Sequence, residues 1–350
     1  MPELGLPEVV AAILALSLTI YVLFGGADFG GGVWDLLAGG PRRDRQREVI
    51  GHAIGPIWEA NHVWLILVIV LTFTCFPPVF ARMGTLLHIP LTLMLFGIVL
   101  RGSAFTFRTY DDEHDAVQRR WGRVFAVASL LTPVLLGACI GAVAADRLGP
   151  LDGPATFTER YLAPWLTPFS LAVGLLALAL FALLAAVFLT LETDDPELVE
   201  DFRRRALWSA VAVFVVAFGA LLLAPGHAPL VSAGLLGSRW ALPFHVATGV
   251  AAVAVLAALW WRRYHLARVA VGAQVSLILW GWAVSQYPYL VPPDLTIRGA
   301  AAPDATLRAV LVALALGAVV LLPSLWYMFR VFKAGPSHSV RRLPPGGLVR

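Results

Sequence analysis

Charged residues are scarce in this 350-residue chain. Asp, Glu, Lys and Arg make up 14% of it, against about 25% in a typical soluble domain. Hydrophobic residues make up 59%, and the mean hydropathy is +0.78. A soluble protein of this size does not have enough polar surface to cover so much apolar material. The composition therefore excludes a soluble enzyme, a nucleic-acid-binding domain and a disordered chain, and it predicts an integral membrane protein.

Cysteine and methionine are also rare. The two cysteines, Cys75 and Cys139, are far apart, and no C-x-x-C or C-x-x-C-H motif is present. This excludes a disulfide framework and a covalently attached haem. Four methionines give little support for haem ligation by a His/Met pair. The net charge of +4 comes from arginine clusters between apolar runs, which is typical of topology signals rather than of nucleic-acid binding.

Nine apolar runs are long enough to cross a bilayer, which takes about 20 helical residues. Their connections place 19 of the 26 Lys and Arg residues on one side and six on the other, and Arg101 lies inside a run. Because Lys and Arg concentrate on the cytoplasmic side, we expect the N-terminus outside and the C-terminus in the cytoplasm. The runs cover residues 8–38, 50–75, 80–107, 122–145, 164–191, 205–224, 240–261, 266–286 and 306–332.

Three charged side chains qualify as lying at membrane depth, away from the ends of these runs, namely Asp28, Glu59 and Arg101. A charge at membrane depth costs at least about 2.5–3.5 kcal/mol, so each one needs a reason. With a rise of about 1.5 Å per residue, Asp28 and Glu59 lie about 13 Å from the cytoplasmic end of their helices, and Arg101 about 10 Å. The topology alone therefore predicts that all three groups share one layer near the cytoplasmic face.

The second run adds a polar stripe to this layer. His52, Glu59 and His62 fall within about 80° of one helix face, while the first run presents glycines beside Asp28 that allow close helix approach. Two interpretations stay open. The acids and histidines form a proton path or a cofactor pocket, or Asp28 or Glu59 pairs with Arg101 and locks the bundle. A third alternative is a haem bound here through His62 or through His88, which lies about 12 Å inside the third run.

Four segments resemble subunit II of the cytochrome bd-type quinol oxidases. They read Gly-Gly-Ala-Asp-Phe-Gly-Gly-Gly at 25–32, Ile-Gly-Pro-Ile-Trp-Glu-Ala-Asn-His-Val-Trp-Leu at 54–65, Phe-Pro-Pro at 76–78 and Leu-Arg-Gly-Ser-Ala-Phe-Thr-Phe-Arg at 100–108. They follow the order that this family has, each in its expected helix. The rest of the chain agrees with the family only in its number of spans and its hydrophobic, arginine-flanked character.

The resemblance implies an all-α integral membrane fold of nine transmembrane helices, arranged as two four-helix bundles plus one peripheral helix. The first bundle would cover residues 1–145, the second 146–286 and the peripheral helix 287–334. We expect the Pro-, Gly- and Ser-rich residues 335–350 to form a disordered cytoplasmic tail.

The resemblance also implies a function within a complex of the bacterial cytoplasmic membrane. A larger subunit I would hold haems b and d, a small single-helix subunit is a further candidate partner, and the complex would oxidise quinol and reduce dioxygen to water. This chain would scaffold subunit I and supply a cytoplasmic proton route, with no catalytic residue or metal of its own. Whether it binds a quinone or a lipid is left open.

The site residues of the family match Asp28, Glu59 and Arg101, but the helix 2 motif differs. The family reads Trp-Asp-Gly-Asn-Glu-Val-Trp, whereas residues 58–64 read Trp-Glu-Ala-Asn-His-Val-Trp, so His62 replaces the second acid. The family acid near the end of helix 3 is replaced by Thr106. The predicted proton path therefore comprises Asp28, Glu59, His62 and His52, with Arg101 as the charge partner.

Two other functions compete with this interpretation. In a purely structural assembly subunit, the buried charges would only lock the bundle, and all proton transfer would stay within subunit I. A stand-alone transporter is disfavoured because buried charge is confined to the first three runs, with no matching broken segments in the later ones.

Overall fold

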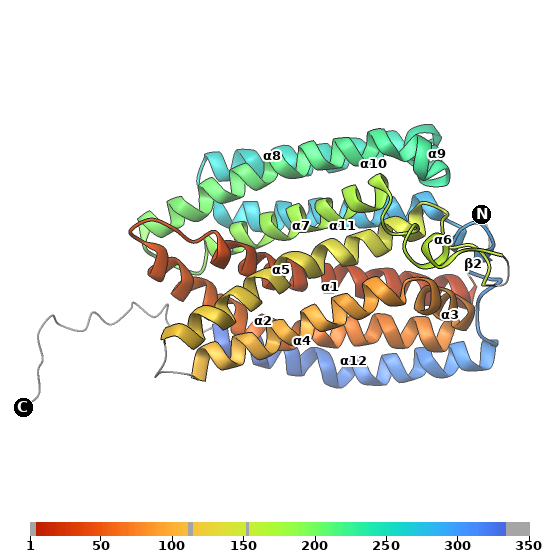
Figure 1. Cartoon of the computed structure of the whole chain (residues 1–350), viewed down its shortest axis with the longest axis horizontal. Helices are drawn as coiled ribbons and strands as arrows, with labels where there is room; N and C mark the ends of the chain where they lie inside the picture. The colour runs from red at the N-terminus through yellow and green to blue at the C-terminus, as the bar shows by residue number, and fades with distance from the viewer. Residues whose placement is uncertain (1–4, 111–114, 152–153, 334–350) are drawn as a thin grey trace, which may run out of the picture.

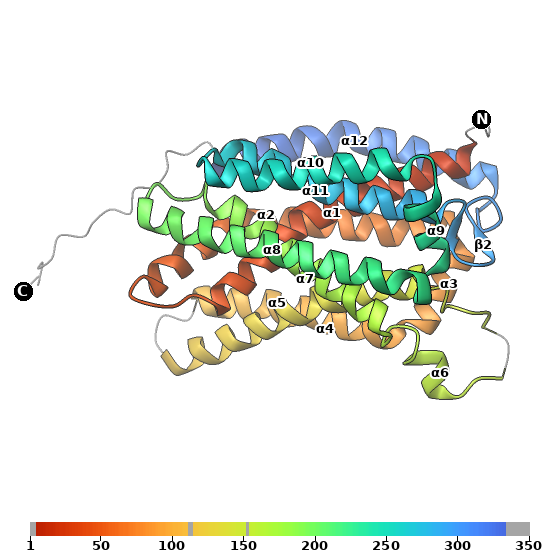
Figure 2. The same ribbon diagram turned by 90° about the horizontal axis from the view of Figure 1, so that it is seen from above.

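The computed structural model describes residues 5–110, 115–151 and 154–333, with the side chains at 55–60, 105, 108–110, 115–119, 329 and 332–333 excepted. The tail predicted at 335–350 lies outside the described residues. The long helices run side by side along one axis (Figures 1 and 2). The elements are α1 (Leu6–Leu36), α2 (Arg43–Cys75), α3 (Pro77–Leu86), α4 (His88–Tyr110), α5 (Asp115–Ala144), α6 (Phe157–Tyr161), α7 (Pro168–Leu189), α8 (Pro196–His227), α9 (Pro229–Gly237), α10 (Ala241–Trp260), α11 (Tyr264–Gln286), β1 (Tyr289–Val291), β2 (Leu295–Thr296) and α12 (Asp304–Lys333).

Seven helices in the described part of the chain are long and apolar enough to cross a membrane, namely α1, α5, α7, α8, α10, α11 and α12. An eighth span is reached if α2 is counted together with α3, although these two helices meet at a bend of 116°. Helix α4 contributes a shorter apolar segment, His88–Ala104. The structure thus confirms an all-α membrane protein.

The third predicted run, 80–107, is interrupted in the structure. Residues 80–86 belong to α3, and the following helix begins only at His88. Two prolines open α3, where the missing N–H groups cost no helical hydrogen bond, and Pro90 occupies the first turn of α4. Both helices are apolar, so hydropathy alone did not reveal the boundary between them.

Helix α1 packs against α2, α5 and α7 and lies at the centre of the fold. Its glycines allow this close packing. A Cβ atom built at Gly30 would lie 2.0 Å from the carbonyl oxygen of Phe181 in α7, and one at Gly32 would lie 2.1 Å from Ser129 Oγ in α5. Close backbone approach through small residues is the usual basis of helix association in membranes, so the glycine-rich segment predicted to favour contact does form the central seam.

Helix α12 lies on the outside of the fold, where it contacts α1 and α2. No residue in its most apolar 18-residue window is buried inside the chain. At the end of the molecule where α1 begins, the β1–β2 hairpin precedes this helix (Figure 1). The Ala302 N–H donates to the Cys75 carbonyl at 2.8 Å, which fixes the start of α12 to the end of α2.

Candidate functional site

An ion pair lies in the interior of the bundle, between α1 and α4. Arg101 donates from Nη1 to Asp28 Oδ2 at 2.7 Å and from Nη2 to Oδ1 at 2.6 Å. A further bond from Nη2 reaches the Asp28 carbonyl at 2.8 Å. The two residues are 2% and 1% exposed. Of the two pairings that the sequence left open, the structure therefore shows Asp28 with Arg101.

The surroundings of Arg101 satisfy most of its remaining hydrogen-bonding and electrostatic needs. Its Nε donates to Ser129 Oγ in α5 at 3.0 Å, and Ser129 in turn donates to the Phe125 carbonyl. The guanidinium carbon lies 4.7 Å from the ring centroid of Phe29 and 4.8 Å from that of Phe125. Four of its five N–H donors are thereby used. The arrangement joins three helices through charge-assisted hydrogen bonds and cation–π contacts.

A small cavity adjoins this ion pair. Its volume of about 10 Å³ is about what one water molecule needs. The Oδ1 atom of Asn61, which lines the cavity, is buried without a hydrogen-bond partner among the described residues. A buried polar atom without a partner is costly, so a water molecule is the natural occupant. The cavity is lined by Tyr21, Phe29, Asn61, His62, Leu65, Ile98 and Arg101.

The structure distributes the other predicted site residues unevenly. His62 lines the cavity beside Arg101, whereas His52 is exposed near the start of α2. Glu59 is a residue of α2, and its side chain is not among those that the structure describes. Three of the predicted groups, Asp28, His62 and Arg101, are thus close neighbours.

The two histidines of the haem alternative lie in different surroundings. His62 borders a cavity far smaller than a haem. His88 is the first residue of α4 rather than a residue about 12 Å inside a span, and it is exposed. Its Nδ1 lies 2.8 Å from the Thr85 carbonyl, and its ring packs edge-on against Tyr161. In the described part of the chain, no cluster of three or more His, Cys, Asp or Glu residues could hold a metal.

Sequence reasoning missed a second buried acid on α1. Asp35 is 2% exposed, and its carboxylate lies 3.8 Å from Arg47 Nε. Seven residues separate it from Asp28, which places both on one helix face. That spacing was the sequence signal that could have indicated a second buried acid. Asp35 lies close to the expected end of the helix, however, where a charge can reach water. Asn61 and Ser129 were also missed as neighbours of the ion pair, because their roles depend on helix rotation.

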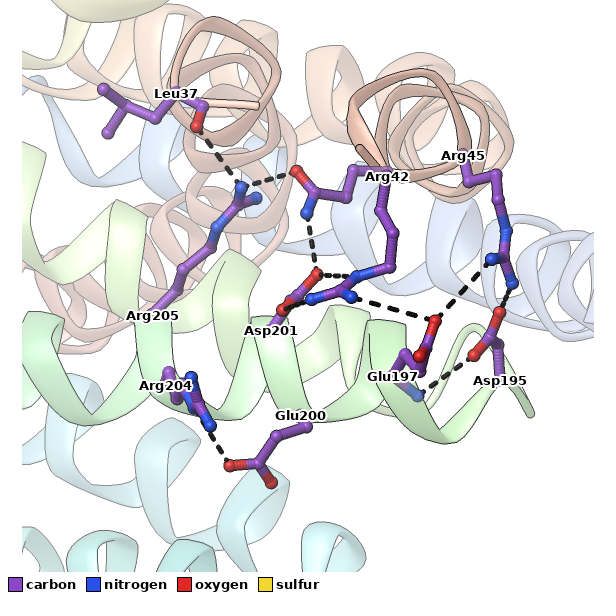
Figure 3. Close-up of polar contacts among 10 residues, drawn as sticks. Leu37, Arg42, Arg45, Asp195, Glu197, Glu200, Asp201, Arg204 and Arg205 are labelled. Atoms are coloured by element: carbon purple, nitrogen blue, oxygen red, sulfur yellow. Dashed lines mark hydrogen bonds and ion pairs between the residues drawn. The ribbon is translucent and has the colours of Figure 1, made fainter. Parts of the chain in front are cut away.

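A polar clasp joins the start of α2 to α8 at the arginine-rich end of the molecule (Figure 3). Arg42 donates two hydrogen bonds to Asp201, at 2.8 and 2.7 Å, and Gln46 Nε2 donates to the same carboxylate at 2.8 Å. Arg205 donates to Gln46 Oε1 at 2.7 Å and to the Leu37 carbonyl at 3.3 Å. The contact with Asp201 raises the pKa of the Arg42 guanidinium, which therefore stays charged.

Aromatic rings support the clasp from beneath. The Arg205 guanidinium lies 5.3 Å from the ring centroid of Trp34 and 5.6 Å from that of Phe202. Trp34 donates from Nε1 to the Ala182 carbonyl in α7 at 2.8 Å. The clasp thus ties α1 and α2 to α7 and α8 through charge, amide and cation–π contacts.

Asp201→Asn is expected to destabilise the chain by about 1.5–3 kcal/mol, because charge-assisted hydrogen bonds to a mostly buried carboxylate are lost. The Asp201 side chain is 15% exposed. The matched control is Glu197→Gln, whose side chain is 63% exposed and lies 3.8 Å from Arg42; it should cost about 1 kcal/mol or less. Thermal unfolding of the purified complex measures both, and equal melting temperatures for the two variants would contradict the importance of the clasp.

Fold and site together define a multi-pass helical membrane protein with an ion pair in its interior. The family model for subunit II of the cytochrome bd terminal oxidases matches residues 6–332, so this chain belongs to that family. The cytochrome bd ubiquinol oxidase subunit 2 of Bacillus subtilis (strain 168) is 26% identical over 339 residues, covering 93% of this chain and 96% of the relative. The cytochrome bd-I ubiquinol oxidase subunit 2 of Escherichia coli (strain K12) is 23% identical over 189 residues, covering 52% and 47%.

A solved structure shares the fold. The bd oxidase of Geobacillus thermodenitrificans contains a chain that matches 95% of this one and 99% of its own length, with a TM-score of 0.74 and 23% identity. The protein is therefore a subunit of a cytochrome bd quinol oxidase, an oxidoreductase complex of the bacterial inner membrane. Membership as subunit II implies a complex with a subunit I.

Proposed function

We propose that this chain scaffolds a haem-bearing subunit I and delivers cytoplasmic protons to it through the cavity beside the Asp28–Arg101 pair. The observation that carries the proposal is the cavity itself. It has room for one water molecule, it is bordered by His62 and Arg101, and within the described part of the chain the buried amide oxygen of Asn61 has no hydrogen-bond partner. A water held between a titratable imidazole and an amide oxygen can pass a proton along.

The side chains of the site have different roles in this proposal. Both carboxylate oxygens of Asp28 accept hydrogen bonds from Arg101, so in this proposal Asp28 is the partner that holds Arg101 in place. His62 is the imidazole beside the cavity, and an imidazole both accepts and donates protons. Glu59 precedes it by three residues on the same face of α2 and matches the first acid of the family motif. His62 and Glu59 therefore carry the protons, and Arg101 orients the site.

In this proposal the chain crosses the membrane nine times, and eight of the spans form two bundles. Helices α1, α2, α4 and α5 form the first bundle, helices α7, α8, α10 and α11 the second, and α12 lies outside both. The exposed arginines at the start of α2 and in the α10–α11 turn support a cytoplasmic location for that end. Haems b and d belong to subunit I in this scheme, and quinol and dioxygen react there.

His62→Gln is expected to lower quinol-dependent oxygen consumption per haem by at least about tenfold, because an amide cannot take up a proton. The residual activity should lose the pH dependence of an imidazole. His245→Gln is the matched control, since that histidine lies on α10 with Nδ1 2.7 Å from the Ala241 carbonyl. Turnover of His62→Gln equal to that of the control, with normal complex yield, would overturn the proton role.

A purely structural role is the second candidate, and the nearly complete satisfaction of the Arg101 donors favours it. Under that alternative, Glu59→Gln and His62→Gln lower the yield of assembled complex and leave turnover per haem unchanged. Quantifying haem spectra alongside oxygen consumption separates the two functions.

A further inference from the structure

The turn between α10 and α11 has an unusual residue at its centre. Helix α10 ends in a Schellman motif, in which Arg263 N–H donates to the Ala258 carbonyl at 2.7 Å and Arg262 N–H donates to the Leu259 carbonyl at 3.3 Å. The residue at the position of Arg262 adopts a left-handed conformation, here with φ of +58°. Glycine is strongly preferred there, because a Cβ atom disfavours this conformation. An arginine at such a position points to a use for its side chain.

The interactions of Arg262 inside the chain do not account for that side chain. Its Nη2 lies 3.5 Å from Glu200 Oε2, a long contact, and its side chain is 68% exposed. Glu200 is held more closely by Arg203 at 2.9 Å and by Arg204 at 3.2 Å. Three guanidinium groups therefore share one carboxylate, which leaves this surface with an excess of positive charge.

Aromatic side chains flank the same charges. Trp260 is 72% exposed and Trp261 is 69% exposed, immediately before the two arginines of the turn. Arg268 is exposed one turn into α11, with its guanidinium carbon 5.1 Å from the ring centroid of Phe188. Exposed tryptophans at the ends of membrane helices lie at the headgroup level, and the arginine fork matches the geometry of a phosphate. The turn thus combines a membrane anchor with a phosphate-binding surface.

We propose that the α10–α11 turn is a binding site for the phosphate of an anionic phospholipid. Arg262 and Arg263 contact the phosphate, Trp260 and Trp261 lie against the glycerol and upper acyl region, and Arg268 adds charge at the same depth. A lipid, rather than a soluble phosphate, is the ligand because the turn joins two apolar helices at the membrane boundary and carries two exposed indole rings. The lipid would also tie the exposed α10–α11 pair to the surrounding bilayer.

The test uses the complete purified complex, depleted of lipid in detergent and titrated with phosphatidylglycerol or phosphatidylcholine. Retained lipid is counted by native mass spectrometry. The variant Arg262→Gly, Arg263→Gln removes both charges, and its glycine relieves the left-handed conformation, so folding should not suffer. Each arginine near an anionic surface contributes about fivefold in binding, so the variant should bind phosphatidylglycerol about 25-fold more weakly. Binding of phosphatidylcholine should not change.

Arg43→Gln is the matched control, because Arg43 is an exposed arginine at the start of α2, outside the tryptophan-bearing turn. It should bind phosphatidylglycerol as the unmodified complex does. Equal phosphatidylglycerol binding by the Arg262→Gly, Arg263→Gln variant and the unmodified complex would overturn the proposal. Displacement of the lipid by millimolar inorganic phosphate would also overturn the proposal. The same holds if the Arg262→Gly, Arg263→Gln variant loses a copurifying protein while its lipid binding stays intact.

Discussion

Arg101→Leu is expected to destabilise the subunit by roughly 3–5 kcal/mol, because it leaves the Asp28 carboxylate buried without a partner. The loss should appear as a lower melting temperature of the purified complex and a lower yield from membranes. Asp28 is 1% exposed, so its carboxylate would be left in the interior without its cationic partner. The Asp28 carbonyl and Ser129 Oγ lose their donors as well.

The controls for this variant separate charge burial from loss of side-chain volume. Arg298→Leu removes an arginine that pairs with Glu8 but is 59% exposed, and it should cost about 1 kcal/mol or less. The double variant Asp28→Asn, Arg101→Met removes both charges and should recover much of the stability, because a neutral pair of similar volume avoids the desolvation penalty. The interpretation fails if Arg101→Leu melts at the same temperature as Arg298→Leu.

Gly30→Ala is expected to disrupt the packing of α1 against α7, although it adds a single methyl group. The new Cβ atom would lie 2.0 Å from the Phe181 carbonyl oxygen and 2.6 Å from its carbon. Both are backbone atoms that cannot move aside by rotating a side chain. Overpacking costs about 1–3 kcal/mol, sometimes more, and here the two helices must separate to relieve it.

A glycine-to-alanine substitution at a position with open space around it should raise the melting temperature rather than lower it. A Cβ atom at Gly51 in α2 meets nothing within 4 Å, so Gly51→Ala should be neutral or stabilising by up to about 1 kcal/mol. Gly26→Ala is intermediate, because the nearest atom is the flexible Leu184 Cδ1 at 2.5 Å. Melting temperatures of the three variants should therefore rank Gly51→Ala above Gly26→Ala above Gly30→Ala. Equal values would show that the glycine seam is not tightly packed.

The sequence predicted the ionic groups well but not their partners. Counting helical residues from the loops placed Asp28 and Arg101 in one layer, because depth depends only on topology and the rise per residue. Which side chains meet depends on helix rotation and crossing, and neither leaves a mark in the composition. The cavity with Asn61 beside His62 was beyond prediction for the same reason.

The break between α3 and α4 shows a second limit. Hydropathy averages over a window, and both helices are apolar, so the run at 80–107 looked continuous.

The polar clasp between Gln46, Asp201 and Arg205 could not be predicted for another reason. Charged residues near the ends of spans predict topology, and nothing local in the sequence indicates that the polar ends of two helices bond to each other across the bundle.

The separations along the chain of the contacts around α1 set an order of assembly during synthesis. Asp28 and Arg101 are 73 residues apart, whereas Trp34 and its acceptor Ala182 are 148 apart. At about 5–20 residues per second, Arg101 emerges roughly 4–15 s after Asp28, and α7 follows α1 by roughly 7–30 s. The lone carboxylate is therefore neutralised well before α7 reaches the ribosome exit. Helix α7 then packs against a partly folded subunit in which Asp28 is already paired with Arg101. The contact surface on α1 is the backbone at Gly30, which has no side chain.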